Sequence, residues 1–242
     1  MKSPLFLSVA LLFATATTGC STVRTQPLTH ENAASIHSIT VIQHRGMEEY
    51  RTLIVFNPAM AFGLIGGMVA AADMNAKSTR LTQALDPART RLQERLATQL
   101  AEGLARDGYA VDTVALDSPK DAPAGAKPPA DDLPKNLNGD AVLSTTMTSG
   151  YVSAGPGMPY VPSVRVNVIA RRQASGAVIY QNTYAYGYTV GESDRAVHLD
   201  ADAKYRFDNI DALVANADEA REALVTGVNA IAERIATDAR RN

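Results

Sequence analysis

The chain of 242 residues contains one cysteine, Cys20. A single thiol cannot form a disulfide within the chain, and it cannot build a cysteine metal cluster. A folded domain made from this chain must therefore be stabilised by its apolar core alone, even in an oxidising compartment. The residues that precede Cys20 in the sequence indicate its role. It follows the charged start Met1-Lys2 and the apolar run 5–16, a pattern typical of an export leader.

The residues directly before Cys20 resemble a bacterial lipobox, in which the cysteine is acylated and becomes the mature N-terminus. Thr17 departs from the usual pattern, which has an aliphatic residue at this place. The alternative is an ordinary signal peptide that ends at a cysteine by chance. The resemblance implies that residues 1–19 are removed and that Cys20 receives a diacylglycerol and an N-acyl chain such as palmitate. No other cofactor is expected.

A lipid anchor on Cys20 would hold the protein on a membrane, because each buried acyl CH2 contributes about 0.8 kcal/mol. Ser21 follows the cysteine, where Asp would resemble the retention signal of the inner membrane. The sequence therefore favours the periplasmic face of the outer membrane. After loss of Lys2 with the leader, 22 basic residues stand against 25 acidic ones, a net charge of −3. This balance and the lack of a basic cluster argue against a nucleic-acid partner.

The mature chain divides into a lipidated tether and one domain. Residues 20–35 are polar and lack periodicity, so we expect a tether there. Residues 36–242 are expected to form a single periplasmic α/β domain. Within it, residues 117–135 are rich in proline, glycine and aspartate, which predicts a long exposed loop.

Periodic patterns predict an α+β (or α/β) domain of two layers, with a mixed, mainly antiparallel sheet. Short β-rich runs at 38–43 and 51–56 suggest a hairpin around Gly46. Further strands are expected at 109–116, 141–152, 164–168 and 178–190. Two long amphipathic helices are expected, and the residues of their apolar faces recur at helical spacing. These residues are Leu92, Leu96, Leu100 and Leu104 in the first helix and Ile210, Ala217, Leu224 and Ile231 in the second.

Residues 52–72 carry no charge, and their second half predicts a small-residue hydrophobic helix. Ala59, Gly63, Gly67 and Ala71 recur at every fourth position, which places small residues on one stripe where another backbone can approach closely. Three alternatives follow. The helix packs on the protein's own sheet, it contacts a partner or another copy through this stripe, or it inserts into a membrane.

A second surface follows from the strands on either side of Ser175-Gly176. If these residues form a two-residue turn, Arg165 lies opposite Tyr186 on an outer face that also holds Tyr180 and Tyr184. Arginine and tyrosine side chains suit a glycan or a protein partner. The alternative is an ordinary amphipathic face, and a turn longer by one residue would change the pairing.

Motifs of catalysis are absent from the sequence, which contains no G-x-S-x-G, H-E-x-x-H, phosphate-loop or G-x-G-x-x-G pattern. No metal site is expected from the four histidines. His198 with Ser193 would be the nearest approach to a hydrolase, but the sequence shows neither a placed base nor an oxyanion hole. We therefore expect a protein that is not an enzyme and has no catalytic residues.

Two segments carry a resemblance to known proteins. Asp140-Ala141-Val142-Leu143, and the run 166–180 with Ser175-Gly176, resemble the strand and hairpin of periplasmic α/β lipoproteins. These include the curli-secretion lipoprotein and the penicillin-binding-protein activators. More generally, the chain resembles a proteobacterial outer-membrane lipoprotein. The resemblance implies a non-enzymatic accessory or assembly factor in envelope biogenesis or secretion.

Such a factor would bind an envelope protein or itself. A lipoprotein that binds peptidoglycan or another cell-surface polysaccharide is the alternative, and a periplasmic hydrolase is the third. The uncharged run 58–72 and the proline-rich loop depart from the named families.

Overall fold

The computed structural model describes residues 25–45, 48–117, 137–189 and 195–241. These residues form one seven-stranded mixed sheet in the order β3-β1-β4-β5-β6-β7, and β2 pairs with a later part of β4. The strands are β1 (Ser38–Arg45), β2 (Tyr50–Ile54), β3 (Ala110–Asp117), β4 (Ala141–Ser153), β5 (Tyr160–Arg172), β6 (Val178–Gly187) and β7 (Val197–Leu199).

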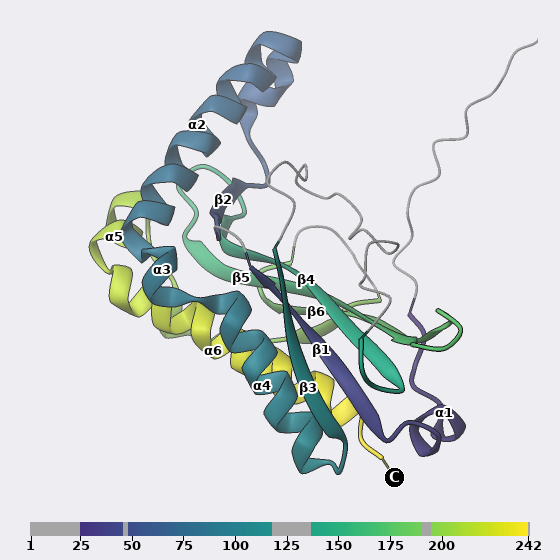
Figure 1. Cartoon of the computed structure of the whole chain (residues 1–242). Coiled ribbons are helices and arrows are strands. Elements are labelled where there is room, and N and C mark those ends of the chain that lie inside the picture. Colours follow the sequence, from purple (N-terminus) through teal and green to yellow (C-terminus); the bar gives the residue numbers. More distant parts are fainter. Residues whose placement is uncertain (1–24, 46–47, 118–136, 190–194, 242) are drawn as a thin grey trace, which may run out of the picture.

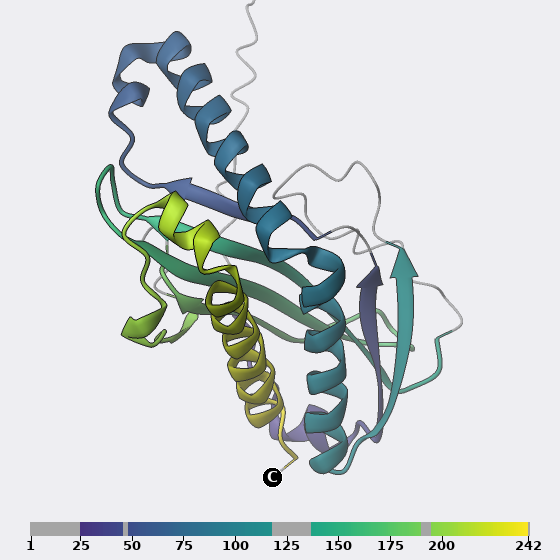
Figure 2. The same ribbon diagram turned by 90° about the vertical axis from the view of Figure 1, so that its left-hand side faces the viewer.

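The long helices α4 and α6 form a layer on one face of this sheet, whereas the short helix α1 lies apart from them (Figure 1 and Figure 2). Helices α4 and α6 lie side by side across the sheet, and α2 extends from this layer past the sheet's edge. This arrangement confirms the expected two-layer α+β class. The helices are α1 (His30–Ala34), η1 (Pro58–Phe62), α2 (Gly63–Leu85), α3 (Pro87–Thr90), α4 (Leu92–Arg106), η2 (Ala203–Tyr205), α5 (Ile210–Ala215) and α6 (Ala217–Asp238).

The core lies between the sheet and helices α4 and α6. Leu92, Leu96, Leu100 and Leu104 are all fully buried, as the sequence predicts for one face of a helix. On the second predicted face, Leu224 and Ile231 are fully buried, whereas Ile210 and Ala217 are half-buried. Val228 and Ile235 of α6 are fully buried as well. Burial of each such side chain contributes about 1.5–3 kcal/mol, so the contact between α4, α6 and the sheet accounts for much of the fold's stability.

Both predicted long helices are interrupted once. Arg91 adopts a left-handed conformation with φ 48° between α3 and α4. Asn216, with φ −107°, separates α5 from α6 without a left-handed turn. Asp86 caps α3 by accepting a hydrogen bond from the Ala88 amide at 3.2 Å, and α4 ends at Arg106.

The predicted hairpin between β1 and β2 is wrong. Both strands pair in parallel with β4, β1 at 141–143 and β2 at 149–153. Two strands that run the same way cannot be the arms of a hairpin, which requires antiparallel neighbours. The two strands therefore lie one after the other along the same edge of β4.

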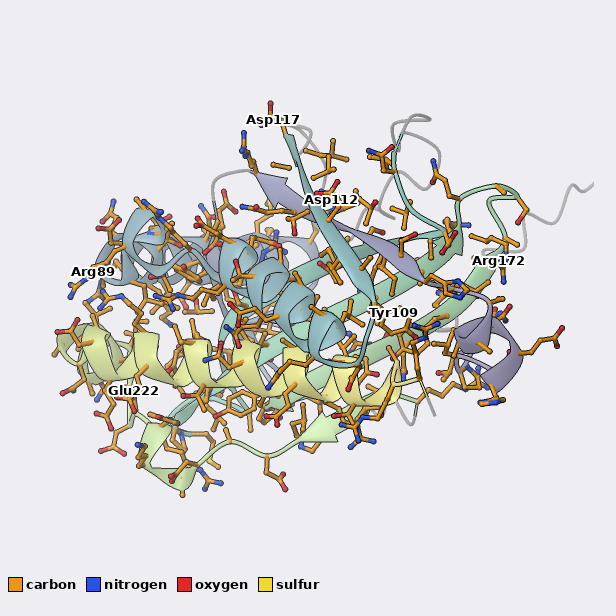
Figure 3. The ribbon with its side chains drawn as sticks, turned by 60° about the horizontal axis from the view of Figure 1, so that its bottom comes forward. Arg89, Tyr109, Asp112, Asp117, Arg172 and Glu222 are labelled. Atoms are coloured by element: carbon orange, nitrogen blue, oxygen red, sulfur yellow. The ribbon has the colours of Figure 1, made fainter. Side chains whose placement is uncertain are left out.

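Part of the expected tether belongs to the domain. Gln26 forms a β-bridge with Gln181 of β6, and its amide donates to the Gln181 carbonyl at 2.7 Å. Helix α1 follows, with Ala33 buried and with Arg172 donating to Ser35 Oγ at 2.9 Å; Figure 3 shows Arg172 beside α1. Cys20 and the leader, and the proline-rich loop from residue 118 to 135, lie outside the described residues.

The register of β5 and β6 differs by one residue from the expected pairing. Val164 lies opposite Tyr186, and Arg165 lies opposite Ala185. The strands are joined by the longer segment 173–177 in place of a two-residue turn, and the register shifts once more at Arg171. Because side chains alternate along a strand, a slip of one residue moves each of them to the other face of the sheet.

Candidate functional site

An arm of apolar residues projects from the domain. We define the apolar arm as residues 55–72, which comprise the end of the β2 connection, η1 and the first half of α2. In both views it stands clear of the sheet, at the end opposite α1 (Figure 1 and Figure 2). Its exposed large side chains, with their exposed fractions, are Val55 (43%), Phe56 (70%), Met60 (60%), Phe62 (78%), Leu64 (82%), Ile65 (73%), Met68 (58%) and Val69 (60%).

The two limbs of the arm pack against each other through small residues. A Cβ at Gly66 would come within 1.8 Å of the Ala59 carbonyl oxygen, so this contact is possible only for glycine. Asn57 accepts a hydrogen bond from the Ala59 amide at 3.0 Å and thereby begins η1. The Val55 amide donates to the Ser153 carbonyl at 2.9 Å, which ties the first limb to the end of β4. The arm is therefore a braced extension of the sheet.

The second half of α2 is fastened to the domain. The Tyr50 amide donates to Thr82 Oγ1, and the Thr52 amide donates to Ser78 Oγ, both at 2.9 Å. Leu81 and Leu85 are fully buried. One continuous helix is thus anchored at its C-terminal half and free at its N-terminal half, so the arm keeps a set direction relative to the sheet.

The predicted small-residue stripe lies on the arm. Gly63 and Ala71 are exposed, and Ala59 and Gly67 are half-buried. The small residues that are buried within the arm are Gly66 and Ala70, which the sequence pattern did not single out. No heavy atom lies within 4 Å of the place that a Cβ would occupy at Gly63 or Gly67. The expectation that this run packs on the protein's own sheet is wrong, because its large side chains face away from the sheet. A contact role for the stripe remains a prediction.

The exposed large residues are the part of this site that the small-residue pattern missed. Leu64, Ile65, Met68 and Val69 follow the spacing i, i+1, i+4 and i+5, which places them on one helical face. The sequence feature that indicates these exposed residues is the absence of charge from residues 52–72. In the described part of the chain, the segment Pro58–Leu85 is long and apolar enough to cross a membrane, judged by length and composition alone.

The expected tyrosine face does not form. Tyr180, Tyr184 and Tyr186 are buried under the helices, whereas Arg165 lies on the opposite side of the sheet. The one-residue slip of β5 against β6 is the cause. The predicted pairing of Arg165 with Tyr186 is therefore wrong. The outer face of tyrosines and arginine on which glycan binding was predicted is absent.

These tyrosines form a buried hydrogen-bonded cluster instead. Tyr184 Oη donates to Asp238 Oδ2 at 2.6 Å and also contacts Tyr180 Oη. Arg234 Nε donates to the other oxygen of Asp238 at 2.9 Å, so the carboxylate is held from two sides. Burial raises the pKa of Tyr180 to about 12, and burial together with Tyr180 raises the pKa of Tyr184 further. Both hydroxyls stay protonated near neutral pH and act as structural donors.

The residues considered for catalysis are not brought into a site. His198 on β7 lies 3.3 Å from Asp200 Oδ1 at an exposed position, and Ser193 lies outside the described residues. His44 is the histidine whose pKa is lowered, because burial penalises its charged form, and its Nε2 has no hydrogen-bond partner. Among the described histidine, cysteine, aspartate and glutamate residues, no three gather where they could hold a metal ion.

No protein-family model matches the chain, and no curated protein matches it. Several solved structures are distantly similar. A homologue of neuraminyllactose-binding hemagglutinin from Helicobacter pylori is 12% identical over 84% of both chains, with a TM-score of 0.39. A PelC dodecamer from Paraburkholderia phytofirmans is 11% identical, covers 90% of this chain and 95% of its own, and has a TM-score of 0.34.

A Xanthomonas campestris protein of the DUF330 family is 8% identical over 88% of both chains, with a TM-score of 0.35. Likenesses this distant support no statement about function.

Proposed function

We propose that this protein is a non-enzymatic accessory factor of the bacterial envelope, attached to the outer membrane through Cys20, that binds envelope proteins or further copies of itself through the apolar arm. The observation behind the proposal is the exposure of the large side chains between Val55 and Val69 on a braced arm. A contiguous apolar patch on a soluble domain is typical of a protein or membrane contact. The open positions at Gly63 and Gly67 let a partner's backbone come close.

The position of the anchor favours a protein over the anchoring bilayer. Residues 20–26 span at most roughly 20 Å when fully extended. Gln26 pairs with Gln181, which lies at the level of Ser144 in β4. The arm begins at the Ser153 end of that strand, roughly 30 Å further on at about 3.3 Å per residue. A lipid on Cys20 therefore holds the end of the domain from which the arm points away.

The test is site-specific photo-crosslinking in cells from Met68 on the arm, with the probe at Thr98 of α4 as the matched exposed control. A discrete crosslinked protein or homo-oligomer from position 68, absent from position 98, supports the proposal. The variant Leu64→Lys should remove that species, because a charge would then be buried in the contact. Crosslinks only to lipid from position 68 would instead assign the arm to a bilayer and refute the proposal.

A further inference from the structure

A groove of about 510 Å³ lies at the base of the apolar arm. It is lined by residues of β2, β4, β5 and α2 and by Tyr188 and Thr189, which follow β6. Its volume falls within the roughly 300–1,000 Å³ that is typical of ligand sites. Ala71 and Met74 of α2 belong to the lining, so the groove begins where the arm joins the domain.

Two arginines of the sheet line this groove beside α2, and both point to the side of the sheet opposite α4 and α6. Thr52 of β2 binds α2, so its neighbour Arg51 points the other way. Val164 and Val166 of β5 are fully buried under the helices, which turns Arg165 to the same side as Arg51. Alternation along the strands thus places both arginines on one side of the sheet, and both line the groove.

Within the described residues, neither guanidinium has a carboxylate partner. Arginines of the helix layer are paired by contrast, for example Arg80 with Asp211 at 2.6 Å. Among the described lining residues, two arginines stand against one carboxylate, Glu49.

The spacing of the two arginines suits an extended ligand. Arg51 pairs with Gly150, Gly150 pairs with Ser163, and Arg165 follows two residues later. Two strand spacings of about 4.8 Å and two residues of about 3.3 Å separate the Cα atoms by roughly 12 Å. Hydroxyl and amide groups also line the groove, at Asn75, Ser78, Thr148, Ser163, Tyr188 and Thr189.

We propose that this groove binds an acidic saccharide, whose carboxylate or phosphate groups pair with Arg51 and Arg165 and whose hydroxyls bond to the polar lining. A planar guanidinium binds a carboxylate or phosphate with two parallel hydrogen bonds, which gives both affinity and orientation. The inference goes beyond the proposed protein contact and does not depend on it. Acid groups spaced along a sugar chain can meet both arginines at once.

The test is titration calorimetry of the purified full-length protein with three probes: a short uronic-acid oligosaccharide, the neutral oligosaccharide of equal length, and a sugar phosphate. We expect one or both acidic probes to bind and the neutral one to bind at least about tenfold more weakly. Arg51→Gln and Arg165→Gln should each weaken binding by about tenfold or more, the loss expected for one charged hydrogen-bonding partner. Arg165→Lys should retain part of the affinity, because it keeps the charge but loses the second hydrogen bond.

Arg106→Gln is the control, since Arg106 is exposed on α4 in the helix layer. Denaturant unfolding of each variant separates loss of the site from loss of the fold. Three outcomes would overturn the inference. The neutral probe binds as tightly as the acidic ones, the groove variants bind with the same affinity as Arg106→Gln, or neither acidic probe binds. Met68→Lys on the arm should bind the saccharide normally, so a failure of the groove and a failure of the protein contact remain distinguishable.

Discussion

Gly227 of α6 lies directly against the ring of Tyr186 in β6, and a Cβ at Gly227 would come within 2.4 Å of the Tyr186 Cδ1 atom. The helix can sit this close to the sheet only because position 227 has no side chain. Tyr186 in turn faces the helix because β5 and β6 pair one residue away from the simplest hairpin register. The contact therefore links the register of two strands to the position of α6 on the sheet.

Replacement of Gly227 by alanine should destabilise the protein by about 1–3 kcal/mol, because the added methyl group overpacks the contact with Tyr186. Gly67→Ala is the matched control, since no atom lies within 4 Å of the place that its new methyl group would occupy. That substitution should leave the free energy of unfolding unchanged or raise it by up to about 1 kcal/mol through helix propensity. Urea unfolding of the two variants checks this, and equal effects would contradict it.

Tyr184→Phe should lower the free energy of unfolding by about 1–3 kcal/mol. The variant removes the hydroxyl that donates to Asp238 at 2.6 Å and leaves buried polar groups without a partner. Tyr188→Phe serves as the control, because Tyr188 is only partly buried after β6. Thermal unfolding of both proteins measures the difference. A wild-type-like midpoint for Tyr184→Phe would show that the cluster does not contribute to stability.

Stability should fall as the pH rises above about 10, the ordinary pKa of tyrosine. Burial raises the folded-state pKa of Tyr180 to about 12, and burial also raises the pKa of Tyr151 and Tyr184. Since the unfolded chain releases these protons first, their contribution is complete below the unfolded pKa and is lost as pH increases toward the folded pKa. Denaturant midpoints between pH 8 and 11 test this, and a constant midpoint across about pH 9–11 would contradict the sign.

The variant carrying both Leu64→Lys and Met68→Lys should keep the unfolding midpoint of the parent, because both side chains are more than half exposed on the arm. It should also bind less of a hydrophobic dye, since it removes part of the exposed apolar patch. Leu81→Ala in the buried half of the same helix is the contrast and should cost about 2–5 kcal/mol. Similar losses of stability in both proteins would mean that the arm packs on the domain after all.

Local patterns located the long helices and most of the strands, but not α1 or β7. The four-residue spacing from Leu92 to Leu104 predicts one buried helical face, and all four positions are fully buried. The class of the fold follows from the same periodicities. The missed features are the parallel pairing of β1 and β2 with β4 and the breaks at Arg91 and Asn216. Strand neighbours are chosen by contacts between residues far apart in the chain, which a local pattern does not contain.

The sequence by itself determined which segments are apolar, which residues form the buried face of α4 and that residues 52–72 carry no charge, because these depend on residue type and helical spacing alone. The tertiary structure decided which side those residues face. A longer connection and a register shift at Arg171 put Tyr184 in the core and Arg165 on the opposite side of the sheet. The contact of Gly66 with Ala59 and the fastening of Leu81 hold the arm out in solvent. The face to which each strand side chain points and the direction of the arm are set by packing between distant segments, which no single segment encodes.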